Sequence, residues 1–178
     1  MSTIDPFDVL LDLEKRCRQN AERLPAAGDV EDKWVGVGFR IGDDKLIADM
    51  TEVGEILDVP EFTKVPGVKS WVVGIANVRG SLLPIMDLKG YILGADMQHR
   101  KRGRLIVINY QGFSTGLLVD EIYGMRHFFV EDQSKDQPQV HSSISPYIKN
   151  MFSRENESWP VFSFENMAKD ERFSLAAL

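Results

Sequence analysis

The sequence contains very little cysteine and histidine. Among its 178 residues there are one cysteine and three histidines. A single cysteine, Cys17, excludes an intramolecular disulfide and a cysteine-based metal cluster. His99, His127 and His141 lack the three- or four-residue spacing that places two metal ligands on one helix face. We therefore expect no metal site, and we interpret Cys17 as a small buried hydrophobe.

Long hydrophobic runs are also missing. No apolar stretch approaches the roughly 18 residues that span a bilayer, and the N-terminus does not resemble a signal peptide. Basic residues are fewer than acidic ones, 21 against 27, so the formal net charge is −6. A negative chain disfavours sequence-independent binding of nucleic acid, which relies on a basic face. We expect a cytoplasmic protein with no direct membrane insertion and no nucleic-acid partner.

The sequence lacks the usual motifs of catalysis and nucleotide binding. There is no nucleophile elbow, P-loop or paired-histidine zinc motif. Two acidic pairs, Asp120-Glu121 and Glu131-Asp132, consist of sequence neighbours, which point to opposite faces of a strand. The glycines of Gly36-Val-Gly38 are followed by Gly42, which is the wrong spacing for a dinucleotide fingerprint. We therefore expect no enzymatic activity and no cofactor.

The first part of the chain predicts one amphipathic helix. Residues 5–24 carry an apolar stripe with spacings of three and four, and Pro25 follows directly. The members of this stripe are Leu10, Leu13, Cys17, Ala21 and Leu24. The stripe either packs on the body of the protein or docks on a partner, and the sequence leaves both open.

From Trp34 onward the pattern is typical of short strands, and it repeats. The segment around Pro84 matches the segment around Pro160, 76 residues later. The same offset pairs Ile75 with Met151, Leu83 with Trp159, Ile85 with Val161 and Leu88 with Phe164. Each repeat has about five short strands and one short helix, the inventory of a small barrel. We predict a mainly β fold with two lobes, approximately 34–95 and 104–168, and strand exchange between them is left open.

The first repeat contains a distinctive hairpin. Gly80-Ser81 predicts a two-residue turn with glycine at its first central position, which holds Val78 and Arg79 at the tip. A cation on a rigid turn loses little entropy on binding, so this tip suits recognition better than catalysis. At the second hairpin the tip becomes Glu155-Asn156, and we interpret that hairpin as mainly structural.

Three motifs in order resemble the CheW family, whose members couple bacterial chemoreceptors to a histidine kinase. They are residues 73–88, residues 116–122 and residues 49–56, and the resemblance spans approximately residues 34–168. The motif positions that we interpret as structural are Asn77, Gly80, Pro84, Asp87, Gly116 and Asp120. For Asp87 an inward hydrogen-bonding carboxylate and a partner contact are both open.

The resemblance implies a fold, partners and binding residues. The fold is two SH3-like five-stranded β-barrels with short helices, covering residues 34–170 between an N-terminal helix and linker (1–33) and a tail (171–178). The function implied is a non-enzymatic adaptor, associated with membrane-bound receptor arrays through its partners. These are a methyl-accepting chemoreceptor and a CheA-like histidine kinase with a regulatory barrel domain. The expected receptor-binding residues are Val53, Val78 and Arg79, and the expected kinase-binding residues are Met50, Glu55 and Gly74.

Further features resemble the branch of the family that serves type IV pili and twitching motility. They are the basic core at residues 15–18, Trp34 at the first strand, residues 65–71 and residues 159–162. An alternative function, a small-barrel nucleic-acid binder, would use the basic run at residues 100–104. The simpler interpretation of that run is a solvated loop between the lobes, and a local contact for an acidic partner is also open.

Overall fold

The computed structural model describes residues 7, 10–11, 13–16, 33–95, 103–134, 136, 138–154 and 157–173. The chain forms two compact units, residues 1–31 and residues 32–178. In the first unit every described residue is helical, within the helix predicted over 5–24. There the side chains of Phe7, Leu10 and Leu13 are exposed. Cys17, Ala21 and Leu24 of the predicted stripe lie outside the described residues, so the role of the stripe stays a prediction.

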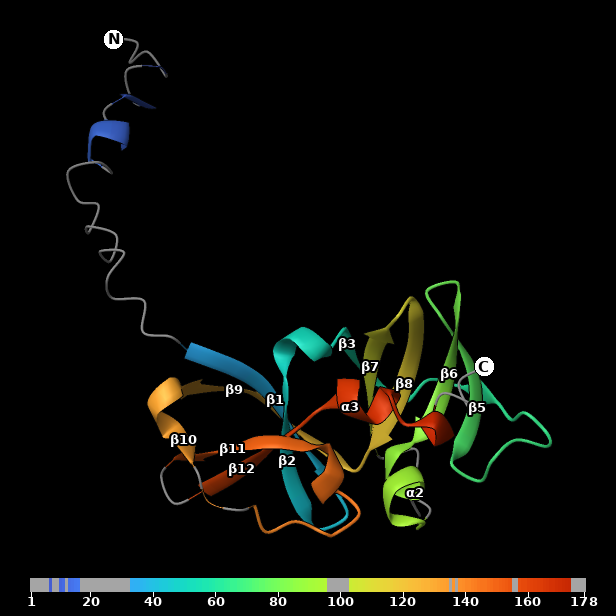
Figure 1. Ribbon diagram of the computed structural model, residues 1–178. Coiled ribbons are helices and arrows are strands. Elements are labelled where there is room, and N and C mark those ends of the chain that lie inside the picture. Colours follow the sequence, from blue (N-terminus) through green and yellow to red (C-terminus); the bar gives the residue numbers. More distant parts are fainter. Residues whose placement is uncertain are drawn as a thin grey trace. The chain divides into compact units, whose positions relative to one another are not determined.

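Most of the regular secondary structure of the second unit is strand (Figure 1). In chain order its elements are β1 (Lys33–Ile41), β2 (Asp44–Asp49), η1 (Met50–Glu52), β3 (Glu55–Asp58), β4 (Phe62–Thr63), β5 (Val72–Val78), β6 (Ser81–Asp87), α2 (Leu88–Leu93), β7 (Arg104–Tyr110), β8 (Phe113–Val119), β9 (Glu121–Phe129), η3 (Val130–Asp132), β10 (Gln133–Ser134), η4 (Ser145–Tyr147), β11 (Ile148–Arg154), β12 (Glu157–Phe162) and α3 (Phe164–Ala168). The mainly β fold class is thus confirmed.

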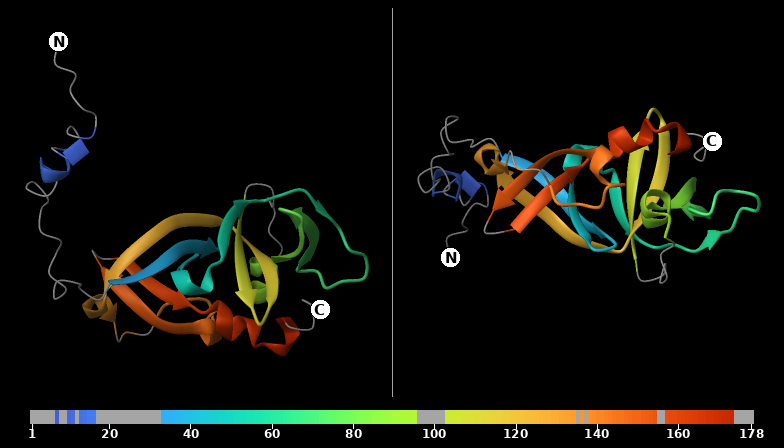
Figure 2. Two further views of the ribbon diagram at one scale, coloured as in Figure 1. Left: turned by 90° about the horizontal axis from the view of Figure 1, so that it is seen from above. Right: turned by 60° about the horizontal axis from the view of Figure 1, so that its bottom comes forward.

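The strands form two six-stranded sheets, both strongly curled (Figure 2). Sheet A has the order β10-β11-β12-β2-β1-β9, and sheet B has the order β3-β7-β8-β6-β5-β4. Each sheet consists of five longer strands and one strand of two residues, β10 or β4. Both halves of the sequence contribute to both sheets, because β1 and β2 join β9 to β12 while β7 and β8 join β3 to β6. Strands are therefore exchanged, as the sequence left open.

The 76-residue repeat is confirmed by the pairing register. In the β5–β6 hairpin Ile75 pairs with Pro84, and in the β11–β12 hairpin Met151 pairs with Pro160. Both hairpins also have an irregularity at the equivalent place, after Val72 and after Ile148. β6 continues into a parallel pair with β8, and β12 into a parallel pair with β2.

The repeat extends to the helix caps that follow the two hairpins. Asp87 Oδ1 accepts a hydrogen bond from Gly90 N at 2.9 Å, which caps α2. Ser163 Oγ accepts one from Asn166 N at 3.1 Å, which caps α3. Asp and Ser both satisfy a free N–H at a helix start, so the change of residue keeps the cap. The carboxylate of Asp87 is fully buried, which agrees with the inward hydrogen-bonding alternative.

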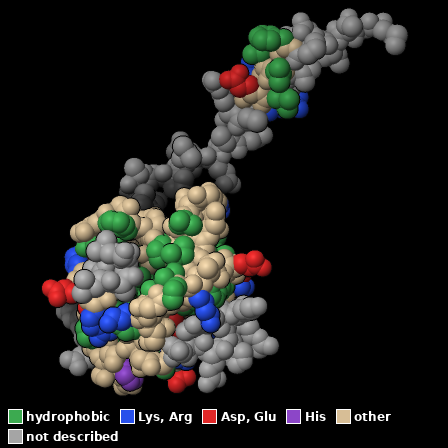
Figure 3. Space-filling model, turned by 90° about the vertical axis from the view of Figure 1, so that its right-hand side faces the viewer, with side chains coloured by type: hydrophobic (Ala, Val, Ile, Leu, Met, Phe, Trp, Pro, Cys, Tyr) green, Lys and Arg blue, Asp and Glu red, His purple; other side chains and the backbone are tan. Residues whose placement is uncertain are grey.

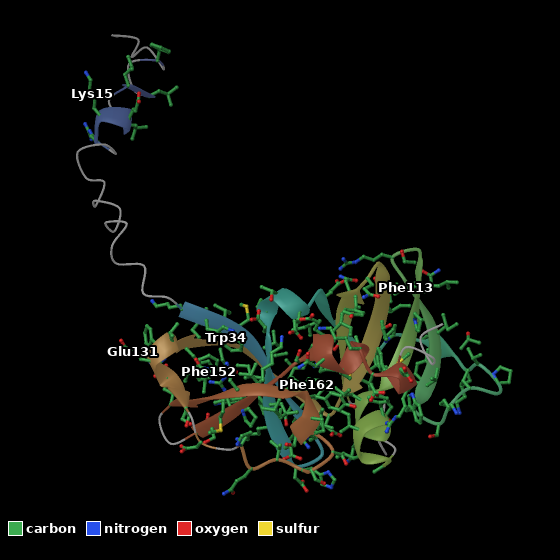
Figure 4. All side chains as sticks on the ribbon, in the orientation of Figure 1. Lys15, Trp34, Phe113, Glu131, Phe152 and Phe162 are labelled. Carbon is green, nitrogen blue, oxygen red and sulfur yellow. The ribbon has the colours of Figure 1, made fainter. Side chains whose placement is uncertain are left out.

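Three hydrophobic clusters hold the sheets in place. The largest contains residues of both sheets, among them Phe39 and Phe162 of sheet A and Met86 and Leu117 of sheet B. Phe39 and Phe162 meet edge to face, and Figure 4 labels Phe162 near the middle of the molecule. The buried residues of the two smaller clusters belong to one sheet each. Each sheet therefore packs some of its buried side chains in a cluster of its own and contributes others to the shared core.

Candidate partner-binding surface at the first hairpin

The turn at the tip of the β5–β6 hairpin differs from the predicted one. Val78 pairs with Ser81, so the two central residues are Arg79 and Gly80 rather than Gly80 and Ser81. Both have positive φ, 51° and 86°, the combination of a type I′ turn. Glycine is favoured at the second central position of a type I′ turn and at the first central position of a type II′ turn. The sequence therefore does not distinguish these two turn types. Asn77 Oδ1 accepts a hydrogen bond from Gly80 N at 2.9 Å and holds the turn.

Arg79 extends from this tip to the first residue of β3. Its Nη2 lies 2.5 Å from Oε1 of Glu55, and its side chain is 77% exposed while that of Glu55 is 32% exposed. β5–β6 and β3 lie on opposite parts of sheet B, with β7 and β8 between them. The ion pair therefore spans the end of the curled sheet. It also joins two residues that the family resemblance assigned to different partners.

The other candidates around β3 differ in accessibility. Met50, in η1, is exposed, whereas Val53 is only 8% exposed and belongs to the core shared by the two sheets. Val78 is half-buried and packs against the cluster inside sheet B. Val53 therefore lies beneath the surface that Met50 presents.

The remaining motif residues have close structural contacts. Gly74 is buried, and a Cβ at this position would lie 2.3 Å from the carbonyl oxygen of Thr63. A Cβ at Gly116 would lie 2.9 Å from the side chain of Leu105. Asp120 Oδ2 accepts a hydrogen bond from Gly42 N at 2.6 Å and so fixes the turn between β1 and β2. None of these contacts involves an exposed side chain of the motif.

A groove of about 570 Å³ opens beside the Arg79–Glu55 pair. The tips of the β5–β6 and β7–β8 hairpins flank it, because β6 and β8 are parallel and begin at the same end of sheet B (Figure 1). Its lining residues are Gly54, Glu55, Val78, Arg79, Ser81, Leu82, Leu83, Pro84, Val107, Asn109, Gly112, Phe113 and Ser114. We call this groove B.

Two exposed apolar side chains stand on the rim of groove B. Leu82 is 75% exposed and Phe113 is 60% exposed. Figure 4 labels Phe113 at the tip of the β7–β8 hairpin, and Figure 3 shows hydrophobic side chains among charged ones on the sheet B end of the molecule. Neither residue was among the binding residues predicted from the sequence. Phe113 follows the turn Gln111-Gly112 directly, and Leu82 follows the turn Arg79-Gly80 after one further residue. An apolar residue so close to a tight turn is the signal that could have found them.

The segment that carries Met50 is fixed by Asp49. Burial raises the pKa of the Asp49 carboxyl, but hydrogen bonds from the Thr51 hydroxyl and N–H and from Trp34 outweigh it and lower that pKa below its ordinary value. The hydrogen bond from Trp34 Nε1 to Asp49 Oδ2 is 3.0 Å long. Asp49 is also the N-cap of η1, since its side chain accepts from Thr51 N. Met50 is therefore presented from an anchored turn.

Other chemistries find little support in the described part of the chain. Among the described residues no group of three or more His, Cys, Asp or Glu side chains could hold a metal ion. In the same residues no helix is long and apolar enough to cross a membrane. Of the basic run at 100–104, residues 100–102 lie outside the described residues, and Arg104 forms an ion pair with Asp58.

Comparison with known proteins places this chain in a family. The model of the CheW-like domain matches residues 35–172. Protein PilI of Pseudomonas aeruginosa is 44% identical over 169 residues, covering 94% of each chain. Protein FrzA of Myxococcus xanthus is 30% identical over 53% of this chain and 59% of its own, and the chemotaxis protein CheW of Thermotoga maritima is 28% identical over 50% and 58%.

A solved structure has the same fold. The scaffolding protein TtCheW from Thermoanaerobacter tengcongensis superposes with a TM-score of 0.66 at 20% identity, covering 78% of this chain and 94% of that one. At this identity the match supports the fold alone. The family assignment rests on the domain model and on the identity to PilI, and it gives no support to the nucleic-acid alternative. The chain belongs to the CheW family.

Proposed function

We propose that this protein is a non-enzymatic adaptor that holds a methyl-accepting chemoreceptor and a CheA-like histidine kinase together. An adaptor acts by raising the effective concentration of one partner near the other, and it needs no chemistry of its own. The family assignment and the identity to PilI support the proposal. Because the resemblance is to the pilus branch of the family, we place this adaptor in the pathway that controls type IV pili and twitching motility, beside the receptor arrays.

The observation that carries the proposal is the surface around the first hairpin. It combines a rigid exposed cation, Arg79, with a groove whose rim carries Leu82 and Phe113. Exposed apolar side chains beside a fixed charge are typical of protein–protein interfaces rather than of catalytic pockets. The regulatory barrel domain of the kinase is the partner that we assign to groove B, with Glu55 in the wall of the groove and Met50 exposed on η1.

The ion pair between Arg79 and Glu55 leads us to modify the division between the partner sites. We propose that the receptor site and the kinase site adjoin at this pair within the wall of groove B: Arg79 and Val78 contact the receptor, and the rest of the groove, with Glu55, contacts the kinase. Val53, being buried, supports Met50 from beneath instead of touching the receptor. Gly74 acts indirectly, by allowing β4 to lie close to β5. A side chain at this position would meet Thr63 of β4 and displace that strand from β5, which carries Val78 of groove B.

The decisive experiment is assembly of the three proteins. The purified chain, the regulatory domain of the kinase and the cytoplasmic part of the receptor are mixed, and the mass of the complex is measured by light scattering after gel filtration. Adjoining sites predict a ternary complex. Competition between kinase and receptor for the chain would contradict the adaptor and indicate a sequestering protein. In cells, Arg79→Glu should be stable and abundant but should not support twitching.

A further inference from the structure

Sheet A has a groove at the place that corresponds to groove B. It has a volume of about 350 Å³ and is lined by Met125, Arg126, His127, Phe128, Arg154, Glu157 and Trp159. Three of these residues, Arg154, Glu157 and Trp159, follow Val78, Ser81 and Leu83 of groove B by the repeat offset of 76. The duplicated hairpin thus forms a groove wall in both sheets. We call this second groove groove A.

The chemistry of groove A is basic and aromatic. The guanidinium of Arg126 lies over the ring of Trp159 at 5.3 Å, and that of Arg154 lies over the ring of Phe129 at 5.4 Å. Lys33 Nζ lies 5.5 Å from the same Phe129 ring. The rings of Trp34 and Phe152, labelled in Figure 4, pack against each other in a tilted arrangement with centroids 4.6 Å apart. Three cations, Lys33, Arg126 and Arg154, therefore contact aromatic rings of sheet A, although the net charge of the protein is −6.

Arg126 is the cation best placed to receive a ligand. Its side chain is exposed, and among the described residues no carboxylate lies within ion-pair distance of it. A guanidinium stacked on an indole face is held flat and keeps its N–H groups free at its edge. Among the described residues that line the groove, the carboxylate is that of Glu157, and it has a basic partner already, since its Oε1 lies 3.7 Å from Lys45 Nζ.

The free edge of β9 is poorly suited to pairing with a strand of a partner. β9 is an end strand of sheet A, and its free edge is partly covered by side chains. Arg154 Nη1 donates to the carbonyl oxygen of His127 at 3.4 Å, and Asp132 Oδ2 accepts from Phe129 N at 2.9 Å. Such cover is a common protection of exposed edges. A partner would therefore contact the side chains of groove A rather than extend the sheet.

We propose that groove A binds an acidic segment of a partner protein. A carboxylate of that segment pairs with the guanidinium of Arg126, and an apolar neighbour covers Met125, which is 62% exposed. Nucleic acid is a poorer occupant, because a long polyanion would also meet the negative charge of the rest of the chain. This site is separate from groove B and does not depend on the adaptor proposal.

The test uses the full chain and a synthetic probe. The probe is a heptapeptide of alternating glutamate and valine with a central phenylalanine, and its lysine-for-glutamate counterpart is the control ligand. Binding is followed by nuclear magnetic resonance, through the amides of residues 125–128 and the indole N–H of Trp159. We expect saturable shifts with the acidic peptide only, and weaker binding at higher salt.

Variants decide whether Arg126 is the contact. Arg126→Glu should weaken binding at least about tenfold, because it replaces a charge-assisted hydrogen bond by like-charge repulsion. Arg104→Glu, the same change at another exposed position of the same unit, should leave binding unchanged. Equal effects of the two variants, or no saturable binding, would overturn the proposal. Preferential binding of a single-stranded oligonucleotide, or self-association through the same amides, would overturn the choice of partner.

Discussion

Arg79 and Glu55 form an ion pair across the end of sheet B, although 24 positions separate them in the chain and two strands lie between their elements. A pair so exposed contributes little to folding, since surface ion pairs are worth about 0–1 kcal/mol. Its importance is that it fixes the direction of a cation at a tip that also carries exposed apolar side chains. Binding at this end of the molecule can therefore be disturbed without disturbing the fold.

Charge reversal tests whether Arg79 contacts the receptor directly. Arg79→Glu should change the free energy of unfolding by less than about 0.5 kcal/mol, because the position is an exposed turn. It should nevertheless strongly weaken receptor association, measured by calorimetry. The double variant Arg79→Glu with Glu55→Arg exchanges the two charges and so restores an ion pair between the same positions. If the double variant recovers receptor binding, Arg79 acts only through Glu55; continued loss supports a direct contact.

The rim of groove B provides a second test. Leu82→Asp should leave the melting temperature nearly unchanged, because this side chain is already exposed. Association with the regulatory domain of the kinase should fall about tenfold or more, since a charge would be buried without a partner. Val68→Asp, in the loop between β4 and β5, is the matched control and should bind normally. Normal binding by the Leu82 variant would remove groove B from the kinase interface.

Substitutions at Asp87 and Ser163 test whether the two N-caps contribute to stability in the same way. Asp87→Ala should cost about 0.5–2 kcal/mol in urea unfolding, as expected for loss of an N-cap. Asp87→Ser, which introduces the residue found at the equivalent place in the second repeat, should retain most of that stability. Ser163→Ala should lower stability in the same direction at α3. If Asp87→Ser were no better than Asp87→Ala, the cap would not be the source of the effect.

Acid should weaken the anchoring of η1 through Asp49. The folded pKa of this carboxyl is below its ordinary value of 3.8, so its contribution to stability is present above that value and is lost as pH falls through the folded pKa. The difference in melting temperature between wild type and Asp49→Asn should therefore shrink between pH 5 and pH 3. Fluorescence of Trp34, whose indole N–H donates to Asp49, should change over the same range. A difference independent of pH would contradict this assignment.

Some features of the protein follow from local sequence alone. The spacing of apolar residues around Pro84 and Pro160 was enough to predict two equivalent hairpins, and their registers agree to the residue. A hairpin register and an N-cap involve neighbours within a few residues, so their determinants are read directly from the chain. The family motifs are local in the same sense, and they predicted both the fold class and the family.

Only the tertiary structure decided which distant residues meet. The exchange of strands brings β3 to the edge of sheet B, and this places Glu55 within reach of Arg79. The same arrangement buries Val53 in the shared core while Met50, three residues earlier, remains exposed. Grooves A and B likewise depend on hairpins from different parts of the chain lying side by side. These contacts depend on how the curled sheets pack, and packing of distant segments leaves no periodic signal in the sequence.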